Sequence, residues 1–468
     1  MTDTLDARRE LLRRRLARQA GSAPTTAPAP SADDGLGVAE RRMWRIHALD
    51  PGSVSHNITL VLDCDGVPAS RLVAGVEAVV ANAEALGSTI AVDEQGTPRR
   101  IPTTVAGRWI EPGRRWSLGS GPDGDDPDAV AAALARTPFD LTREAPIRAR
   151  VIGDTAVLSF HHLAVDDTSW PLLLGSVLAG RWTGAVAAGA AEGPAAGSLA
   201  AAVDHARATW AADDMRFPLS GERPATTPED SWLAPLDEAP GTHLRRALDT
   251  ADLAAFTAVA PEAGGTGNAA LIVLIALTVT AATGAADHVL LVPADNRRAD
   301  QTPDRVGYCG NIVPIRFSFD PACTVGDALR TGCAAVYRAL AHSAVDFGPV
   351  LTELRTAGGR FPVVEVLASV RNAPMRGVPV PAGGAVAYRS VCSGIAPYPL
   401  SLAIEIGDRD DAHLEVDVQP VPGPAFAARA ADTLCDLLRA VPGSADLPLH
   451  RLLAGIPRSH PDDDEAHA

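Results

Sequence analysis

Apolar residues recur along this chain with two different spacings, and together these spacings predict alternating strands and helices. Short apolar runs predict strands at Ile58–Leu62 and Thr155–Phe160. A spacing of about 3.6 residues predicts a helix over Leu72–Leu86, and the almost wholly apolar Ala269–Thr283 predicts a buried helix. The remaining predictions are helices at Ala129–Arg136, Pro171–Leu178, Val325–His342 and Ala425–Ala440, and strands at Val289–Pro293, Ile312–Phe317, Val363–Val370, Ala403–Ile406 and Leu414–Val418. Strands alternate with helices in both halves of the chain, which indicates α/β layers.

The length of the chain predicts more than one folded domain. Its 468 residues exceed one ordinary core and suit two domains of roughly 200 residues each. We expect the first domain at 35–213 and the second at 243–455, joined by the proline-rich stretch 214–242. An N-terminal segment, 1–34, and an acidic tail, 456–468, flank them.

The segments outside the expected domains differ in charge. Arg8–Arg18 predicts a short basic amphipathic helix, and Gly21–Asp34 a flexible linker. Together they are either a solvated leader or a docking element for a partner protein. Thr183–Ser198 is rich in glycine and alanine and predicts a mobile loop. The tail around Ser459–Glu465 is acidic and is either a solvated end or a dock for a basic helix.

Composition excludes several classes of partner. The net charge of −16 argues against nucleic acid, because phosphate binding needs clustered cations. No apolar run reaches the ~18 residues that span a bilayer, and the N-terminus lacks the order of a signal peptide. The six cysteines lack CxxC spacing, which favours reduced thiols in a cytoplasmic protein. The twelve histidines form no HExxH-like pattern, so we expect no metal.

Two adjacent histidines, His161 and His162, follow the predicted strand Thr155–Phe160. Side chains of neighbouring strand residues point to opposite faces, so one histidine can enter a cleft while the other anchors the turn. A neutral imidazole can take a proton from an amine or alcohol and return it. Asp166 can fix the turn or pair with a cation. The alternative is a purely structural histidine pair.

The residues around these histidines carry a family resemblance. The sequence from Pro138–Leu141 through Ala145–Arg150 to Ser169-Trp170 resembles the HHxxxDG region of nonribosomal peptide synthetase condensation domains, which are relatives of chloramphenicol acetyltransferase. Further similar segments occur in family order over about residues 35 to 455. They are Leu36–Trp44, Leu49–Ile58, Asn296-Arg297, Val306–Asn311, His342–Phe347 and Phe361–Pro374.

The resemblance implies an α/β fold of two acetyltransferase-like lobes arranged as a V, with the active site at their junction. It places a helix at Leu199–Trp210 that closes the first lobe. By the same resemblance, His162 is the catalytic residue, either as general base or as an anchor for the nucleophile. His161 and Asp166 then support it. Asn311 would line the cleft and donate to the oxyanion, or alternatively satisfy backbone groups at a strand end.

Three departures from the family pattern bear on the histidine motif. Ala83 and Gly87 stand where the family has a histidine and an arginine. Because that arginine could hold the motif carboxylate, Asp166 needs another cation, and the two possible partners are Arg148 and Arg297. Asp167 replaces the final glycine of the motif and adds bulk and charge beside the base.

The implied function is condensation in natural-product, including antibiotic, biosynthesis. An acyl or aminoacyl thioester on a carrier protein would meet an amine or hydroxyl nucleophile and form an amide or ester. The phosphopantetheine arm of the carrier protein delivers the substrate, and we expect no cofactor bound by this chain. The sequence has no carrier-protein, adenylation or thioesterase motif, so we expect a free-standing condensation enzyme, or one excised from an assembly line, that acts on a carrier-bound or a soluble acceptor. Other synthetase subunits could dock through its termini.

Three rival functions remain open. Ser169-Trp170 is also typical of epimerisation domains, but the Glu-Gly-His segment of that class is absent. Ala83, Gly87 and Asp167 favour a catalytically degenerate module that binds carrier-bound peptide and recruits a partner enzyme. An acyltransferase that uses acyl-CoA is the third alternative.

Overall fold

The computed structural model describes residues 36–93, 96–102, 117–118, 126–184, 196–212, 215, 218–220, 239–297, 305–356, 365–408 and 411–456. The predicted N-terminal helix and linker and the acidic tail lie outside these ranges, as do most of the predicted loop and connection. No helix in the described part is long and apolar enough to cross a membrane.

The chain folds into two units, and neither is continuous in sequence. The first takes its described residues from Met1–Gly193, Asp295–Gly310 and Ala373–Ser393. The second takes them from Pro194–Ala294, Asn311–Asn372 and Gly394–Ala468. The expected division into 35–213 and 243–455 therefore differs from the structure, because two segments of the second half return to the first unit. Periodicity is a local signal and carries no information on such returns.

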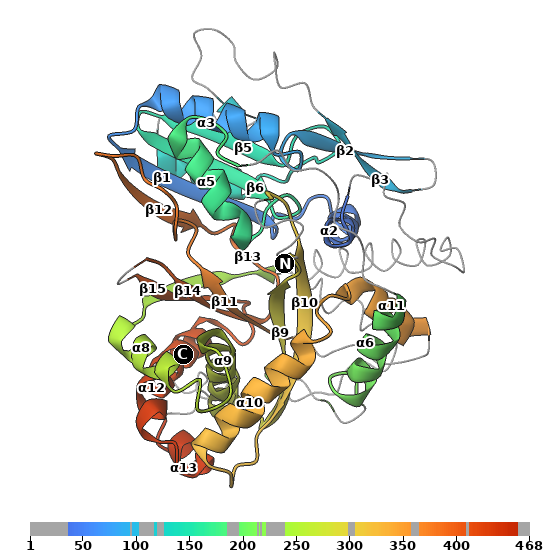
Figure 1. Ribbon diagram of the computed structural model, residues 1–468, viewed down its shortest axis with the longest axis vertical. Coiled ribbons are helices and arrows are strands. Elements are labelled where there is room, and N and C mark those ends of the chain that lie inside the picture. The colour runs from blue at the N-terminus through green and yellow to red at the C-terminus, as the bar shows by residue number, and fades with distance from the viewer. Residues whose placement is uncertain are drawn as a thin grey trace. The chain divides into compact units, whose positions relative to one another are not determined.

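The first unit is built on an antiparallel sheet with the strand order β12-β1-β6-β5-β4. Its strands are β12 (Ala385–Val391), β1 (Asn57–Asp65), β6 (Thr155–His161), β5 (Ile147–Ile152) and β4 (Ser117–Leu118). Helices α3 (Ala69–Asn82) and α5 (Trp170–Ala179) pack together and lie over one face of the sheet (Figure 1). Helix α4 (Pro127–Ala135) packs against β1 and β6 on the opposite face.

The alternation of β6 decides where its terminal histidine points. Leu158 and Phe160 belong to the apolar core under α3 and α5. Val157 faces the other way, toward α4. Successive strand residues alternate faces, so His161 shares the α4 side with Val157. The pairing of β1 with β6 then places His161 opposite Asn57, whose side-chain amide donates to the last carbonyls of α4.

The first unit also contains a helix and a hairpin that apolar spacing did not predict. Helix α2 (Val38–Leu49) begins after Gly37, whose N–H donates to the Glu40 carboxylate at 2.7 Å. A separate hairpin joins β2 (Ser88–Val92) to β3 (Pro98–Pro102). The predicted helix over Leu72–Leu86 ends at Asn82, and a turn follows it. Gly87 closes this turn: a Cβ there would lie 2.3 Å from the Val80 carbonyl oxygen, so no larger residue fits.

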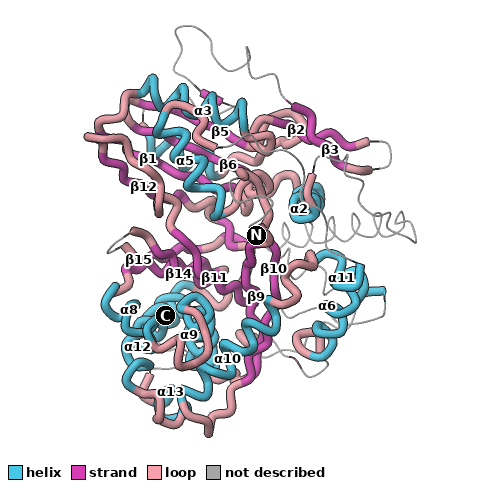
Figure 2. The backbone as a smooth tube through the Cα atoms, viewed as in Figure 1, coloured by secondary structure: helices cyan, strands magenta, loops and turns pink. Residues whose placement is uncertain are grey.

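The second unit is built on a mixed sheet with the strand order β10-β9-β11-β14-β15-β8. Its strands are β10 (Gly310–Ser318), β9 (Asp287–Asp295), β11 (Val366–Asn372), β14 (Leu400–Ile406), β15 (Ala412–Val418) and β8 (Thr242–Ala247). Its helices include α8 (Thr250–Ala258), α9 (Gly267–Thr283), α10 (Val325–Leu340), α12 (Pro424–Ala440) and α13 (Leu449–Ala454). Helix α9 is buried from Ala269 to Ala282, as its composition predicts, with α10 and α12 against it (Figure 2).

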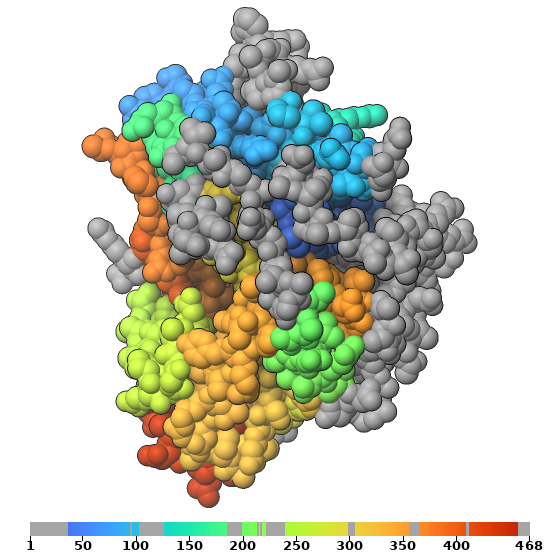
Figure 3. All heavy atoms as spheres, turned by 45° about the vertical axis from the view of Figure 1, so that its right-hand side comes forward, coloured from blue at the N-terminus to red at the C-terminus, as the bar shows by residue number. Residues whose placement is uncertain are grey.

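A smaller helical layer completes the second unit. Helix α6 (Ala196–Ala208) packs against α11 (Phe347–Thr356), and Figure 3 shows their surfaces side by side. The helix expected at Leu199–Trp210 therefore exists, but it belongs to the second unit and not to the first. Short strands β7 (Ala239–Pro240) and β13 (Ile395–Ala396) pair with each other in the same unit.

Candidate active site at the histidine turn

The histidine motif forms a tight turn between β6 and α5. His161 is the last residue of β6, and Asp166 caps the short 3-10 helix η1 (Asp167–Ser169) that leads into α5. The Asp166 carboxylate accepts from the Ser169 N–H at 3.1 Å and from its hydroxyl at 2.9 Å. The Asp therefore fixes the turn in the way that short polar caps do.

His161 is buried and serves the interior of the first unit. Its ring lies edge-on to those of His47 and Phe139, at centroid distances of 5.0 and 6.0 Å. Its Nδ1 accepts from the Leu163 N–H at 3.1 Å. Burial, followed by repulsion from His47 and His56, lowers the pKa of His161 well below its usual value. A neutral, enclosed imidazole of this kind supports the turn, as predicted.

Two histidines that the sequence analysis did not single out line the same interior. His56 is half-buried and its ring stacks 6.0 Å from that of His161. Burial, followed by repulsion from His162 and His47, lowers the pKa of His56 to about 3. Burial also lowers the pKa of His47, against the opposing effect of Asp140 and Asp50. Isolated histidines at positions 47 and 56 carry no motif, so only the fold reveals the cluster.

Among the described residues, the Nδ1 of His162 has a hydrogen-bond partner and its Nε2 has none. Its side chain is half-buried, and its Nδ1 lies 2.7 Å from the carbonyl oxygen of Val165. A carbonyl can only accept, so Nδ1 must carry the proton. Nε2 then carries a lone pair and can accept a proton from a substrate. Its own N–H donates to the His56 carbonyl at 2.8 Å, which anchors the backbone of the turn.

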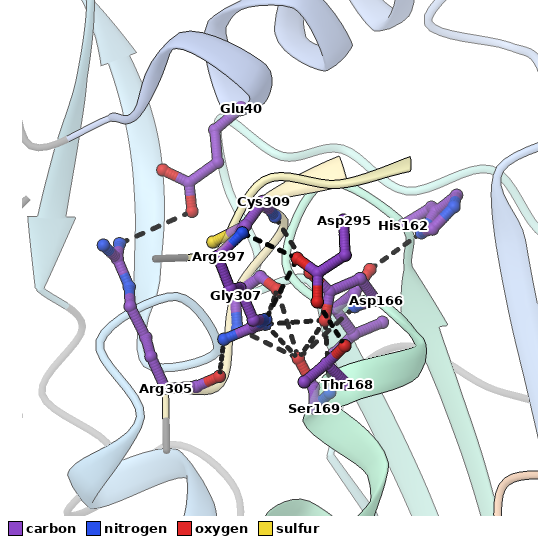
Figure 4. A network of polar contacts seen from close by, with 11 residues as sticks. Glu40, His162, Asp166, Thr168, Ser169, Asp295, Arg297, Arg305, Gly307 and Cys309 are labelled. Carbon is purple, nitrogen blue, oxygen red and sulfur yellow. Dashed lines mark hydrogen bonds and ion pairs between the residues drawn. The ribbon is translucent and has the colours of Figure 1, made fainter. Parts of the chain in front are cut away.

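Asp166 finds its cation in Arg297. The Arg297 Nη2 lies 2.6 Å from the Asp166 Oδ1, and both side chains are nearly buried. The other Asp166 oxygen accepts from the Cys309 N–H at 2.9 Å. Figure 4 shows Arg297 bridging Asp166 to the carbonyls of Gly307 and Arg305, to which it donates at 2.9 and 2.5 Å. The segment 295–310 is thereby tied to the histidine turn, and the prediction of Arg297 as partner is confirmed.

Arg148, the other predicted partner for Asp166, has a different role. Its guanidinium donates to Glu144 at 2.5 and 3.0 Å and to the carbonyls of Thr137 and Pro138. It also lies over the Phe139 ring, 4.0 Å from the centroid. The prediction that Arg148 could hold Asp166 is therefore wrong. These acceptors offset the cost of burying the Arg148 charge, and they tie β5 to the turn before it.

Asp167 and Thr168 are exposed at the start of η1. The Thr168 hydroxyl donates to Asp295 at 2.8 Å, adding a second tie to the 295–310 segment. No described residue pairs with the Asp167 carboxylate. A negative group in the first turn of a helix is favourable by itself, which accounts for an aspartate at this position without a partner.

A buried ion cluster connects α2 to the same segment. The Glu40 carboxylate lies 2.7 Å from Arg100 and 3.7 Å from Arg305. Arg100 also donates to the Ala85 carbonyl at 3.2 Å. Its guanidinium thus reaches the turn that carries Gly87.

Cys309 occupies the position between Tyr308 and Gly310 beside Asp166. Burial raises the pKa of its thiol to about 11, against the lowering effect of Arg297. The thiolate is the nucleophilic form of cysteine. Cys309 is therefore protonated at neutral pH and does not offer a second nucleophile at this site.

Asn311 is the second residue of β10 and the first that belongs to the second unit. Its side-chain amide is hydrogen-bonded through both its nitrogen and its oxygen. Its Nδ2 donates to the carbonyls of Ser343 and Val345, both at 2.7 Å. Its Oδ1 accepts from the Phe347 N–H at 3.0 Å. Both amide hydrogens are used by backbone acceptors, so neither is left for an oxyanion. These contacts support the alternative in which Asn311 satisfies backbone groups.

Comparison with curated proteins shows that the chain is similar to segments of several peptide synthetases. No family model matches it. It is 27% identical over 348 residues to an isonitrile lipopeptide synthase of Streptomyces coeruleorubidus, a match that covers 69% of this chain and 22% of that protein. It is 26% identical over 378 residues to phosphinothricin tripeptide synthetase PhsC of Streptomyces viridochromogenes, covering 74% of this chain and 34% of that protein. The chain thus spans about a third or less of these relatives.

Solved structures identify the fold. The condensation domain of the Monacolin K polyketide synthase MokA superposes with a TM-score of 0.69 at 15% identity, covering 89% of this chain and 98% of that one. The first condensation domain of the calcium-dependent antibiotic synthetase gives 0.63 at 20% identity, with 89% and 98% covered. The starter condensation domain of rhizomide synthetase RzmA, in a complex with C8-CoA, gives 0.65 at 16% identity, with 89% and 96% covered.

The turn with His161, His162 and Asp166, the two α/β units and these likenesses all agree with the resemblance drawn from the sequence. The chain therefore has the fold of the solved condensation domains.

Proposed function

We propose that this chain is a condensation enzyme that transfers an acyl or aminoacyl group from a carrier-protein thioester to an amine or hydroxyl nucleophile. The observation that carries the proposal is the bond from His162 Nδ1 to the Val165 carbonyl. It fixes the tautomer in which Nε2 accepts a proton. His161 beside it is buried and its nitrogen is engaged, so only one of the two imidazoles has this property.

The chemistry requires one proton to move twice. The N–H or O–H of the nucleophile gives its proton to His162 Nε2 as the heteroatom attacks the thioester carbonyl. The tetrahedral intermediate then breaks its C–S bond, and the proton returns from the imidazolium to the leaving thiolate. Asp166 and Arg297 hold the turn during these steps and do not exchange protons. Holding donor and nucleophile together supplies much of the rate, up to ~7–11 kcal/mol for well-oriented reactants.

The proposed donor arrives on the phosphopantetheine arm of a carrier protein, and the chain itself binds no cofactor in this scheme. Likeness to segments of multidomain synthetases supports a carrier protein as partner, with other synthetase subunits as further partners. The RzmA domain was solved with C8-CoA, so acyl-CoA is a second donor worth including. The acceptor is carrier-bound or soluble, and the product an amide or an ester.

The test incubates the purified chain with a carrier protein loaded with an acyl or aminoacyl group, and separately with acyl-CoA. Amine and alcohol acceptors are added, and products are weighed by mass spectrometry. His162→Ala is the matched variant. Product formed by the native chain and lost in the variant supports the proposal, and the donor that works identifies the class.

A negative result in this assay would point to a second function. If no donor and acceptor pair reacts while the loaded carrier protein binds tightly, the chain is a recruitment module and not a transferase. The exposed Asp167 in place of the motif glycine is the observation that keeps this second function in view. Loss of the α-hydrogen of a carrier-bound aminoacyl group into solvent would instead identify an epimerase.

A further inference from the structure

Tyr308 is the aromatic residue that borders the ring of His162. The two ring centroids lie 4.9 Å apart with an interplanar angle of 69°, an edge-to-face contact. Tyr308 is buried in the apolar cluster that also contains Leu163, the residue after His162. Nothing in the motif itself calls for an aromatic residue here, and the proposed chemistry above assigns it no part.

Backbone bonds on both sides of Tyr308 hold it against the histidine turn. The Gly307 N–H donates to the Ser169 hydroxyl at 3.2 Å, and the hydroxyl oxygen of Ser169 lies 3.1 Å from the Gly307 carbonyl oxygen. The Cys309 N–H donates to Asp166 at 2.9 Å. Both neighbours of Tyr308 are therefore bonded to residues of the same motif. The backbone of Tyr308 therefore cannot move away from the histidine turn without breaking these contacts.

The far end of the Tyr308 side chain is also held. Arg42 from α2 donates from Nη2 to the Tyr308 hydroxyl at 3.2 Å and to the Gly310 carbonyl at 2.9 Å. Its guanidinium carbon lies 5.9 Å from the centre of the ring. The phenol is thus fixed at its backbone by the motif turn and at its hydroxyl by α2.

We propose that Tyr308 is a positioning residue that holds the His162 ring in the orientation and tautomer that expose Nε2. The bond from Nδ1 to Val165 is a single hydrogen bond across a soft torsion, χ2, so by itself it opposes rotation of the imidazole only weakly. A rotation of the ring would replace Nδ1–H by a carbon at the carbonyl and favour the other tautomer. The Tyr308 ring occupies the space beside the imidazole and opposes that rotation. This inference rests on the proposed role of His162.

The experiment compares Tyr308→Leu, Tyr308→Phe and Arg42→Met in the full chain. Histidine ring nitrogens are observed by ¹⁵N NMR, and the signals of His162 are assigned by their loss in His162→Gln. In the native chain we expect a single tautomer with Nδ1 protonated. Tyr308→Leu should give mixed tautomers and lower kcat about 10- to 100-fold, the range for small misplacements of a reacting group, with little change in KM. Tyr308→Phe and Arg42→Met both keep an aromatic ring beside His162, so each should lower kcat only about threefold, although they remove one and two hydrogen bonds from the charged Arg42 guanidinium.

A matched control separates position from stability. Tyr337 in α10 is another tyrosine whose hydroxyl is bonded, in its case to the Thr266 N–H at 2.8 Å, and it belongs to the other unit. Tyr337→Leu should leave the His162 tautomer and kcat unchanged. If Tyr308→Leu does not fold, Tyr308→Met replaces it in the same comparison.

The outcomes distinguish this inference from the proposed function. A folded Tyr308→Leu or Tyr308→Met variant with a native tautomer and native kcat would overturn the positioning role. If His162→Ala proves fully active, the proposed function fails, but the ¹⁵N spectra still decide whether Tyr308 fixes the ring. Mixed tautomers in the native chain would also contradict the inference.

Discussion

Two sites carry polar side chains that the family resemblance marks as functional: the histidine turn of the first unit and the Asn311 strand end of the second. They differ in whether those side chains keep a hydrogen-bonding atom unused. At the histidine turn, His162 uses one nitrogen to bond Val165 and keeps the other as an acceptor. At the strand end, Asn311 gives both amide hydrogens to carbonyls and its oxygen to an N–H. The comparison teaches that a motif residue is a candidate for chemistry only when its local hydrogen bonds leave an atom unused.

The strongest test of this comparison is His162→Ala. Loss of a general base typically costs about 10²-fold or more in turnover, and we expect a loss of that size with an unchanged melting temperature. The measurement is the single-turnover rate of product formation from a loaded carrier protein. A folded variant with the native rate would remove His162 from the mechanism and erase the contrast with Asn311.

Breaking the pair that anchors the turn should affect stability more than specificity. Arg297→Met leaves Asp166 buried without its cation, and removal of one partner of a buried pair typically costs about 3–5 kcal/mol of unfolding free energy. Urea unfolding measures it. Arg297→Met combined with Asp166→Asn should recover part of the loss, because the uncompensated charge is gone. The matched single variant Arg148→Met should not be rescued by Asp166→Asn, since Arg148 pairs with Glu144.

Asn311→Ala tests whether the Asn311 amide has only a structural role. It removes the partners of two carbonyls and one N–H, so we expect about 2–3 kcal/mol of lost stability, in line with unsatisfied buried groups. At a temperature well below its unfolding transition, kcat should stay within about threefold of the native value. A fall of 10²-fold or more, the size seen when an oxyanion donor is lost, would show that the amide is released for catalysis.

Acid should weaken the histidine turn before other parts of the first unit. The pKa of His56 is about 3 in the folded chain and about 6.5 in an unfolded one. The unfolded chain therefore binds the proton first, and stability is lost as pH falls from about 6.5 toward 3. His56→Gln should reduce the loss between pH 7 and pH 5 by about 1–2 kcal/mol, measured by urea unfolding at each pH. His450→Gln, at an exposed histidine bonded to a carbonyl, is the control for the substitution itself.

The smallest expected effect is that of Asp167→Gly. The side chain is exposed at the start of η1, so its removal should cost no more than about 1 kcal/mol through the lost helix-end charge. We expect the variant to accept bulkier acceptors and to turn over severalfold faster, because glycine removes bulk beside the base. Slower turnover would instead assign the carboxylate an electrostatic role, and an unchanged rate and acceptor range would show that it points away from the substrate.

The sequence by itself determined the element types and the motif. Apolar spacing predicted β1, β6, α9 and α12, because burial on one face or all round imposes a local period. The order of residues around His161 and His162 predicted the condensation fold, and the alternation of a strand predicted that the two rings would have different roles.

Only the tertiary structure decided which residues meet across long separations. Arg297 rather than Arg148 holds Asp166, 131 positions away, because the segment 295–310 returns to the first unit. The same return brings Tyr308 to His162 and Arg305 to Glu40. The commitment of the Asn311 amide to the backbone at 343–347 depends on the path of another loop. These pairings follow from chain topology, which has no local period, so no pattern along the sequence could reveal them.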